Sequence, residues 1–403
     1  MTEHAAADAL TTAGADRPSG RPGPGWVLGV LLGAAMVWLT WHSIRKGIWV
    51  DLDVYMAGGR AILDRSDLYA VTVHGLPFTY PPFAAVVFVP LALLPDVAAR
   101  VVLTLVSWAA LATVVEVLRR RLALTPLQVV PTVLVVLALE PLLRTLLLGQ
   151  VNAVLIALVV LDCFVVPERH RGWLIGVAAG IKLTPAIFVV WLLLRREWGA
   201  ALRAAAAGLV TVGVGLVAAP SSSWFYWTGG FGDLGRFGAA SVLGTDNQSL
   251  SAAVARLAGL TSLPAPLALA SGFVAVGVGS WVAARCLRRG DDVGALLAVA
   301  LGGLLASPVS WSHHWLWVAP LLLWAVGARR RAWAVVVAAV CWLGPFWAVY
   351  RKIPDAAAYP AADRMVAAAY VVVGLATLVV LARGPSGTSR GAPCQAEGST
   401  SNT

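Results

Sequence analysis

Polar and charged side chains that could do chemistry occur at only a few places in an otherwise apolar sequence. The first place is Val50-Asp51-Leu52-Asp53-Val54-Tyr55, directly after an apolar run. A carboxylate at the outer mouth of a membrane cavity could act as a general base and take the proton of a sugar hydroxyl as a bond forms. The alternatives for Asp51 are a solvated loop aspartate and, with Asp53, a metal–nucleotide-sugar motif. The metal alternative is weaker because nucleotide sugars are cytosolic and this segment is assigned to the outer side.

The second place is Gly180-Ile181-Lys182-Leu183-Thr184-Pro185, which interrupts an apolar run. An ionisable group inside a membrane segment is costly, so it is a functional candidate by default. A lysine beside the free backbone N–H groups of a helix break could bind a phosphate. The alternative is that Lys182 only extends its ammonium group to the membrane interface.

Further polar segments supply candidate partners for these two residues. His313 and His314 lie in Ser310–Trp315, and adjacent histidines diverge by about 100° on a helix, which makes them a poor metal pair. One of them could contact the phosphate or orient the base, or both could lie among interfacial tryptophans. Gln150 and Asn152 could bind hydroxyls or cap helix ends. The full set of candidate substrate-binding residues is Tyr55, Tyr80, Gln150, Asn152, Asn247 and Gln248.

The elements that must position these residues are membrane helices. Of the 403 residues, 59% are hydrophobic and only 12% are charged, against about 25% charged in soluble domains. Apolar runs recur from Trp26 to Leu381 and predict an all-α, polytopic membrane protein. This excludes a soluble enzyme, a nucleic-acid module and a disordered scaffold. The net charge of +10 reflects basic residues at the ends of apolar runs, so no nucleic-acid partner is expected.

The basic residues concentrate in five short connections between apolar runs. Lys and Arg in short loops mark the cytoplasmic side, so an even number of crossings is expected between successive clusters. The result is about twelve transmembrane helices with both chain ends inside and all the polar segments named above outside. The clusters are Arg119–Arg121, Arg169 with Arg171, Arg195–Arg196, Arg285 with Arg288–Arg289, and Arg329–Arg331.

Two apolar segments do not fit a simple crossing. Residues 173–194 carry basic clusters at both ends, and Pro185 breaks the helix between them. We therefore expect a re-entrant hairpin of two short helices with Lys182 at its tip. Residues 83–94 are short and flanked by prolines, so we expect a helix in the outer interface, within the first outer loop.

Six motifs in order resemble those of the actinobacterial polyprenyl-phosphate-mannose-dependent α-mannosyltransferases, glycosyltransferase family 87, which have a GT-C fold. The resemblance covers roughly residues 26–380. The motifs are Val50–Tyr55, Phe78-Thr79-Tyr80-Pro81-Pro82-Phe83, Leu148-Gly149-Gln150-Val151-Asn152, Gly180–Pro185, Asp246-Asn247-Gln248-Ser249-Leu250 and Ser307–Trp315.

The resemblance implies a β-linked mannosyl phosphate polyprenol donor, inversion at the anomeric carbon and an α-linked product. It maps the catalytic aspartate of the family onto Asp51 and not onto Asp53. It also implies a glycolipid or lipoglycan acceptor, and it leaves α-1,2 and α-1,6 linkages open, with α-1,2 favoured. The phosphate leaves as an anion and needs no general acid, so one base and one cation suffice. We therefore expect no cofactor and no metal.

The resulting prediction is a multi-pass glycosyltransferase of the plasma membrane with its site on the extracytoplasmic face. Its predicted parts are a disordered cytoplasmic N-terminus (1–25), a GT-C transmembrane catalytic domain (26–382) and a disordered cytoplasmic tail (383–403). Two alternatives stay open: a transferase for another polyprenyl-phosphate sugar, and a transporter or flippase of a lipid-linked substrate. Visible internal repeats, which many transporters have, are absent from the sequence, and this favours the enzyme.

Overall fold

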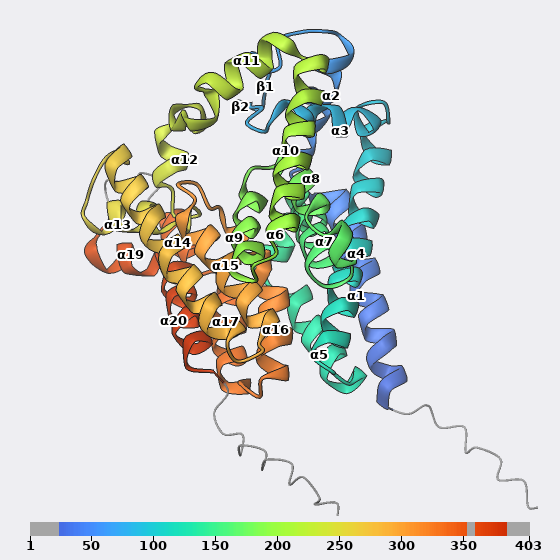
Figure 1. Cartoon of the computed structure of the whole chain (residues 1–403), viewed down its shortest axis with the longest axis vertical. Helices are drawn as coiled ribbons and strands as arrows, with labels where there is room; N and C mark the ends of the chain where they lie inside the picture. The colour runs from blue at the N-terminus through green and yellow to red at the C-terminus, as the bar shows by residue number, and fades with distance from the viewer. Residues whose placement is uncertain (1–23, 353–358, 385–403) are drawn as a thin grey trace, which may run out of the picture.

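The computed structural model describes residues 24–352 and 359–384, and these residues form an almost entirely helical molecule (Figure 1). The only strands among them are β1 (Thr72–Val73) and β2 (Leu76–Pro77), which pair as a short antiparallel hairpin. The all-α membrane class predicted from the sequence is therefore confirmed. The two expected disordered termini fall outside the described residues, apart from a few residues that belong to the first and last helices.

The helices follow one another in a chain of long and short segments. The first half contains α1 (Pro24–Lys46), α2 (Val50–Leu63), α3 (Pro82–Ala92), α4 (Asp96–Arg121), α5 (Pro126–Leu137), α6 (Glu140–Leu148), α7 (Asn152–Phe164), α8 (Trp173–Ile181), η2 (Thr184–Phe188), α9 (Val189–Leu194) and α10 (Trp198–Ala218). The second half contains α11 (Pro220–Thr228), η3 (Gly230–Gly232), η4 (Leu234–Phe237), α12 (Ala239–Leu243), α13 (Leu250–Leu257), α14 (Ala265–Leu287), α15 (Asp292–Ala306), η5 (Ser312–Trp317), α16 (Val318–Gly327), α17 (Arg331–Leu343), α18 (Phe346–Lys352), α19 (Ala361–Val366) and α20 (Ala369–Arg383).

Five helices of the described residues are long and apolar enough to cross a membrane, or six if the bent pair α5–α6 counts as one span. The expected count of twelve is therefore not confirmed. Several expected crossings are interrupted instead of continuous. The chain bends by 59° between α5 and α6, where Pro141 starts a new helix because it lacks the N–H that would continue the old one.

The expected re-entrant hairpin is present and consists of α8, η2 and α9. Its two ends meet, because Nη1 of Arg171 donates to both carboxylate oxygens of Glu197 at 2.7 Å. The helix breaks at Lys182, which is extended, and Pro185 lies in the 3-10 turn that follows. Lys182 is thus carried at the tip, away from the paired ends.

The helix ends that carry the basic clusters lie in the middle and lower parts of the molecule in Figure 1, away from α2, α3 and α11. Arg195 pairs with Asp292 at 2.5 Å, and Arg289 donates to the carbonyl oxygen of Ala382 at 2.7 Å. Arg121 likewise donates to the carbonyl oxygen of Phe164. These contacts join the ends of α4, α7, α9, α14, α15 and α20, as the charge pattern predicts.

The opposite end is built by α2, α3, α11 and the β-hairpin (Figure 1). The segment expected to be a simple outer loop at 45–82 contains helix α2 instead. Trp49 has a left-handed backbone (φ 58°) that separates α2 from α1. Asp51 and Asp53 lie in the first turn of α2, where carboxylates stabilise a helix. Residues 220–257, between α10 and α14, likewise form short helices.

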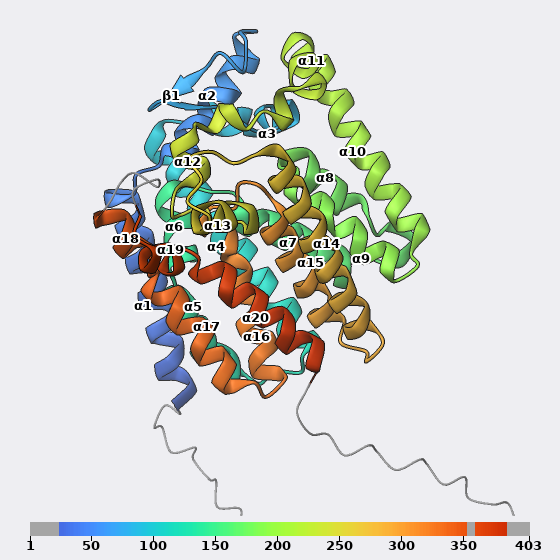
Figure 2. The same cartoon turned by 90° about the vertical axis from the view of Figure 1, so that its left-hand side faces the viewer.

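Helix α15 forms the centre of the larger core, and twelve of its fifteen residues are buried. Figure 2 shows α14, α15 and α20 packed beside one another on one side of the molecule. A second core lies between α2, α3, α4, α7 and α8. The end of α15 and the tip of the hairpin meet between these two cores.

Candidate active site

Asp51 is positioned by a close approach between α2 and the turn that precedes α7. Gly149 in this turn has φ +72°, and a Cβ there would lie 2.7 Å from Cβ of Leu52. Only glycine adopts this backbone without strain at such close range. The turn therefore brings Gln150 directly against the first turn of α2.

A network of buried hydroxyl and amide groups orients the carboxylate. The hydroxyl of Tyr55 donates to Oε1 of Gln150 at 2.9 Å and lies 3.0 Å from the hydroxyl of Tyr80. Oε1 of Gln150 accepts from Tyr55, so the amide nitrogen of Gln150 is the group left to act on Asp51, whose pKa Gln150 lowers. The expected residues Tyr55, Tyr80 and Gln150 thus surround the candidate base.

The carboxyl group of Asp51 is partly exposed and carries a shifted pKa. Burial raises the pKa of Asp51 to about 6, while the Gln150 hydrogen bond and the charges of Lys182 and Arg144 act in the opposite direction. A base with a pKa just below neutral is mostly ionised at pH 7 and still accepts a proton well. This environment suits general-base chemistry.

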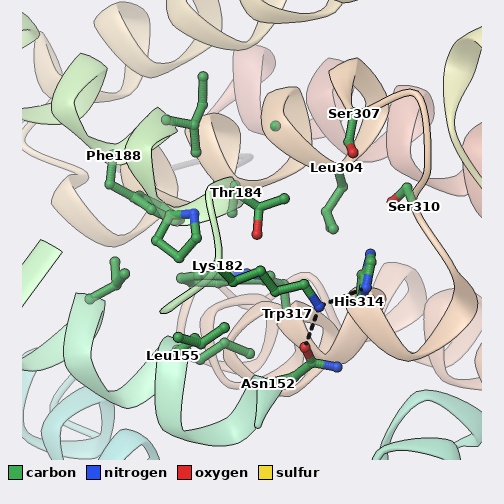
Figure 3. Close-up of a pocket in the computed structure, with 16 residues that line it drawn as sticks. Asn152, Leu155, Lys182, Thr184, Phe188, Leu304, Ser307, Ser310, His314 and Trp317 are labelled. Atoms are coloured by element: carbon green, nitrogen blue, oxygen red, sulfur yellow. Dashed lines mark hydrogen bonds between the residues drawn. The ribbon is translucent and has the colours of Figure 1, made fainter. Parts of the chain in front are cut away.

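Lys182 lies at the tip of the hairpin with its ammonium group in the cavity (Figure 3). Its Nζ is 2.9 Å from Nε2 of His314, 3.3 Å from Oδ1 of Asn152 and 5.6 Å from the ring centre of Tyr80. Within the part of the chain that the structure describes, Lys182 makes no ion pair. The ammonium group is therefore held by neutral partners and available to an anion.

The two histidines have different surroundings. His314 contacts Lys182 and lines both pockets at this place, whereas His313 lines neither. The main-chain oxygen of His313 accepts from Nδ2 of Asn152 at 3.0 Å, and its own Nε2 is buried without a partner. The geometry thus gives His314 the place beside a ligand on Lys182.

Two pockets share Lys182, Thr184, Ser307 and His314 and differ in the rest of their lining. One, of about 50 Å³, runs between apolar side chains of α7, η2 and α15. The other, of about 220 Å³, is lined with aromatic rings from Tyr80, Tyr226, Phe231, Phe237 and Trp311. The segment Thr79–Pro81 before α3, and not α3 itself, forms part of this wall. A small, mostly apolar pocket and a larger aromatic pocket thus share one cation.

Asn247 and Gln248, expected to bind substrate, have all their side-chain polar atoms committed to the main chain. Asn247 donates to the oxygens of Val242 and Pro308 and accepts from Ser249 and Ser310, while Gln248 donates to Thr245 and Ala367 and accepts from Tyr370. Both side chains are fully buried. The side chain of Asn247 supports the segment that begins at Ser310, and that of Gln248 links its own turn to Ala367 and Tyr370. Their contact with substrate stays a prediction, and these hydrogen bonds do not support it.

Three charged residues of this region were not singled out from the sequence. Glu140 is buried and accepts hydrogen bonds from Ser312, Trp347 and Tyr370. Arg144 follows one turn later in α6, and Asp246 lies in the turn before α13. Charged residues four apart inside the apolar run 133–148 are the signal that could have identified Glu140 and Arg144.

A family model matches residues 78–308 of the chain, more than half of its length, and its description is glycosyltransferase family 87. Asp51 lies outside that match, whereas Lys182 lies inside it. No solved structure matches the chain.

Similar proteins of mycobacteria span most of the chain. A polyprenol-phosphate-mannose-dependent alpha-(1-2)-phosphatidylinositol mannoside mannosyltransferase of Mycobacterium tuberculosis is 39% identical, over 76% of this chain and 77% of its own. The protein of that name from Mycolicibacterium smegmatis is 37% identical over 80% of each chain. A phosphatidylinositol pentamannoside mannosyltransferase of M. tuberculosis is 35% identical, over 78% of this chain and 77% of its own.

Proposed function

The chain belongs to glycosyltransferase family 87, and from this membership we propose that it forms an α-1,2 bond between mannose and a phosphatidylinositol mannoside. It is a membrane glycosyltransferase, and its relatives depend on polyprenol-phosphate-mannose. The proposed donor is this mannosyl lipid. The proposed acceptor is a glycolipid hydroxyl presented at the membrane surface.

One observation carries the proposed mechanism: the ammonium of Lys182 lines both pockets and is near enough to Asp51 to lower the pKa of that carboxyl group, and neither group belongs to an ion pair of the described residues. Asp51 takes the proton of the acceptor hydroxyl as that oxygen attacks the anomeric carbon. The bond to the phosphate breaks, and its electron pair leaves with the phosphate, which Lys182 and His314 hold. The apolar side chains of α7, η2 and α15 that line the smaller pocket suit the prenyl unit next to the phosphate.

The test separates transfer from transport. Purified protein in detergent is mixed with radiolabelled mannosyl phosphoprenol and phosphatidylinositol mannoside, without any sealed compartment. We expect label to appear in the acceptor glycolipid. A transporter or flippase, the alternative from the sequence, would give no labelled glycolipid here but would move the donor across the wall of a sealed vesicle.

We also propose that the cavity opens on the extracytoplasmic face of the plasma membrane, since the helix ends that carry the basic clusters lie away from α2, α3 and α11. In a background without native cysteines, Ser221→Cys on α11 and Arg288→Cys in a basic cluster introduce exposed thiols. An impermeant maleimide should label Ser221→Cys in intact spheroplasts and Arg288→Cys only after lysis. The reverse pattern would invert the proposed orientation.

The shifted pKa of Asp51 predicts a pH profile. Because the ionised form is the base, kcat/KM should rise through pH 6, and at pH 5 it should be about a tenth of its plateau. Burial raises the folded pKa above the ordinary 3.8, so protonating Asp51 favours the folded state. The loss of activity at acidic pH is therefore not caused by unfolding through protonation of Asp51. Tryptophan fluorescence at pH 5 checks that the protein remains folded. A rate that stays constant down to pH 4.5 would contradict the assignment.

A further inference from the structure

The aromatic pocket beside Lys182 is a part of the site that the mechanism above does not use. It shares Lys182 and His314 with the smaller pocket, and aromatic rings from distant parts of the sequence, from Tyr80 to Trp311, converge on the rest of its wall. The mechanism places the phosphate on Lys182 and the prenyl unit in the smaller pocket. It therefore leaves the larger pocket without a ligand.

The covalent order of the donor indicates what this pocket holds. In a mannosyl phosphoprenol the phosphate lies between the prenyl unit and the sugar. With the phosphate on Lys182 and His314, and the prenyl unit against the apolar side chains of the smaller pocket, the sugar must extend into the other space that begins at the same two residues. Water takes about 30 Å³ per molecule in the liquid, so about 220 Å³ holds roughly seven waters, a volume comparable with that of one sugar ring.

Trp311 is fixed in the aromatic pocket by its own backbone. This backbone pairs with that of Asn247 as an isolated antiparallel bridge, and the carbonyl oxygen of Trp311 accepts from the backbone N–H of His314 at 2.8 Å. The flanking residues Ser310 and Ser312 are buried, whereas Trp311 is half-buried and lines the pocket. Of these three consecutive residues, Trp311 is therefore the one whose side chain is presented to the aromatic pocket.

Two neighbouring rings hold the indole of Trp311 in place. Its ring centre lies 5.7 Å from that of Phe237 and 5.7 Å from that of His314, with interplanar angles of 70° and 61°. Edge-to-face arrangements of this kind are favoured between aromatic rings. Because Nε2 of His314 is 2.9 Å from Nζ of Lys182, the indole lies directly beside the groups assigned to the phosphate. This is the place where a sugar attached to that phosphate would begin.

A sugar ring carries C–H groups on its faces and hydroxyl groups around its edge. Its faces therefore pack against aromatic rings, while its edge needs polar partners, and the pocket supplies these with Thr79 and Thr184. We propose that the aromatic pocket binds the mannose of the donor and that Trp311 is the ring against which this sugar packs, an inference that rests on the proposed donor.

Tyr80 connects this pocket to the candidate base. Its ring lines the pocket and has its centre 5.6 Å from Nζ of Lys182, while its hydroxyl lies 3.0 Å from that of Tyr55. Tyr55 follows Asp51 by one turn of α2, so both lie on the same face of that helix. A mannose in the pocket is thus separated from the α2 network by one side chain, which is the arrangement that transfer requires.

The test compares the binding of two lipids that differ only in the sugar. Purified full-length protein is titrated with radiolabelled mannosyl phosphoprenol and with radiolabelled prenyl phosphate of the same chain length. Trp311→Ala should raise the Kd of the mannosyl lipid roughly 10- to 100-fold, the loss expected when an aromatic residue inside a contact is truncated. The Kd of the prenyl phosphate should stay within about twofold, because no contact with phosphate or prenyl unit is removed. Trp224→Ala is the matched control, because Trp224 is an exposed tryptophan of α11 that lines neither pocket; it should change neither Kd.

Trp311→Phe, which keeps a ring, should recover part of the affinity for the mannosyl lipid. Trp311→Leu, which keeps an apolar side chain without a ring, should show the sugar-specific loss and replaces the alanine variant if that variant does not fold. Equal losses for both lipids, or no loss for either, would overturn the inference. A normal Kd of the donor together with a raised KM for phosphatidylinositol mannoside would also overturn it, because the pocket would then hold the acceptor. Binding needs no turnover, so a wild-type protein that prefers the mannosyl lipid but transfers no mannose would overturn the proposed function alone.

Discussion

Replacing Asp51 by asparagine should reduce mannosyl transfer roughly 10²- to 10⁴-fold, the usual value of a general base. Asparagine has the shape of the aspartate and can hold the acceptor hydroxyl, but it cannot accept the proton. The rate of transfer is measured with purified protein and radiolabelled donor. Donor binding and the melting temperature should remain close to those of the wild type, because the side chain fills the same space.

Asp53→Asn is the matched control for this substitution. Asp53 lies two residues further along α2, and its carboxylate lies 3.0 Å from Nε2 of His74. It should therefore retain most of the activity. The two variants are assayed with and without EDTA: two inactive variants together with an EDTA-sensitive wild type would move the chemistry to a metal pair. An active Asp51→Asn protein would falsify the general-base role.

Replacing Lys182 by methionine should weaken donor binding more than any other single change at the phosphate end. Methionine keeps the unbranched, apolar stem but removes the charge from the contact with phosphate. Losing one partner of a buried charged contact costs on the order of 2–5 kcal/mol, which is an affinity at least about 30-fold lower. The measurement is equilibrium binding of radiolabelled mannosyl phosphoprenol.

Lys46→Met is the control, because Lys46 is an exposed lysine at the end of α1; it should bind the donor as the wild type does. Lys182→Arg should restore part of the affinity and not all of it, since the guanidinium fork differs in shape from an ammonium. If Lys182→Met binds the donor normally, the lysine has no contact with the phosphate and the proposed role is wrong.

The parts of the fold that follow from local chemistry could be predicted from the sequence. The hairpin around Lys182 follows from basic residues at both of its ends and a proline in its middle. The placement of the basic clusters away from α2, α3 and α11 follows from their spacing relative to the apolar runs. Both are consequences of charge and helix breaking, which act over a few residues.

The remaining features depend on contacts between distant segments. The number of full crossings could not be predicted, because hydropathy does not show where a run such as 126–148 bends. The role of the Asn247 and Gln248 side chains could not be predicted either, because an amide side chain can bind a sugar or hydrogen-bond two turns of the protein to each other. Only the fold shows that Asn247 bonds to Pro308 and Ser310 ahead of His314, and that Gln248 bonds to Ala367 and Tyr370.

The most direct test of the account is the structure of the product's new glycosidic bond. The mechanism is a single displacement with Asp51 as base and Lys182 on the leaving phosphate, so a β-linked donor must give an α-linked mannose. The glycolipid made by the purified protein is analysed by NMR at the anomeric position of the added sugar. The account predicts an α-configured mannose on O2 of the acceptor sugar; a β-configured product would show retention and contradict the single displacement.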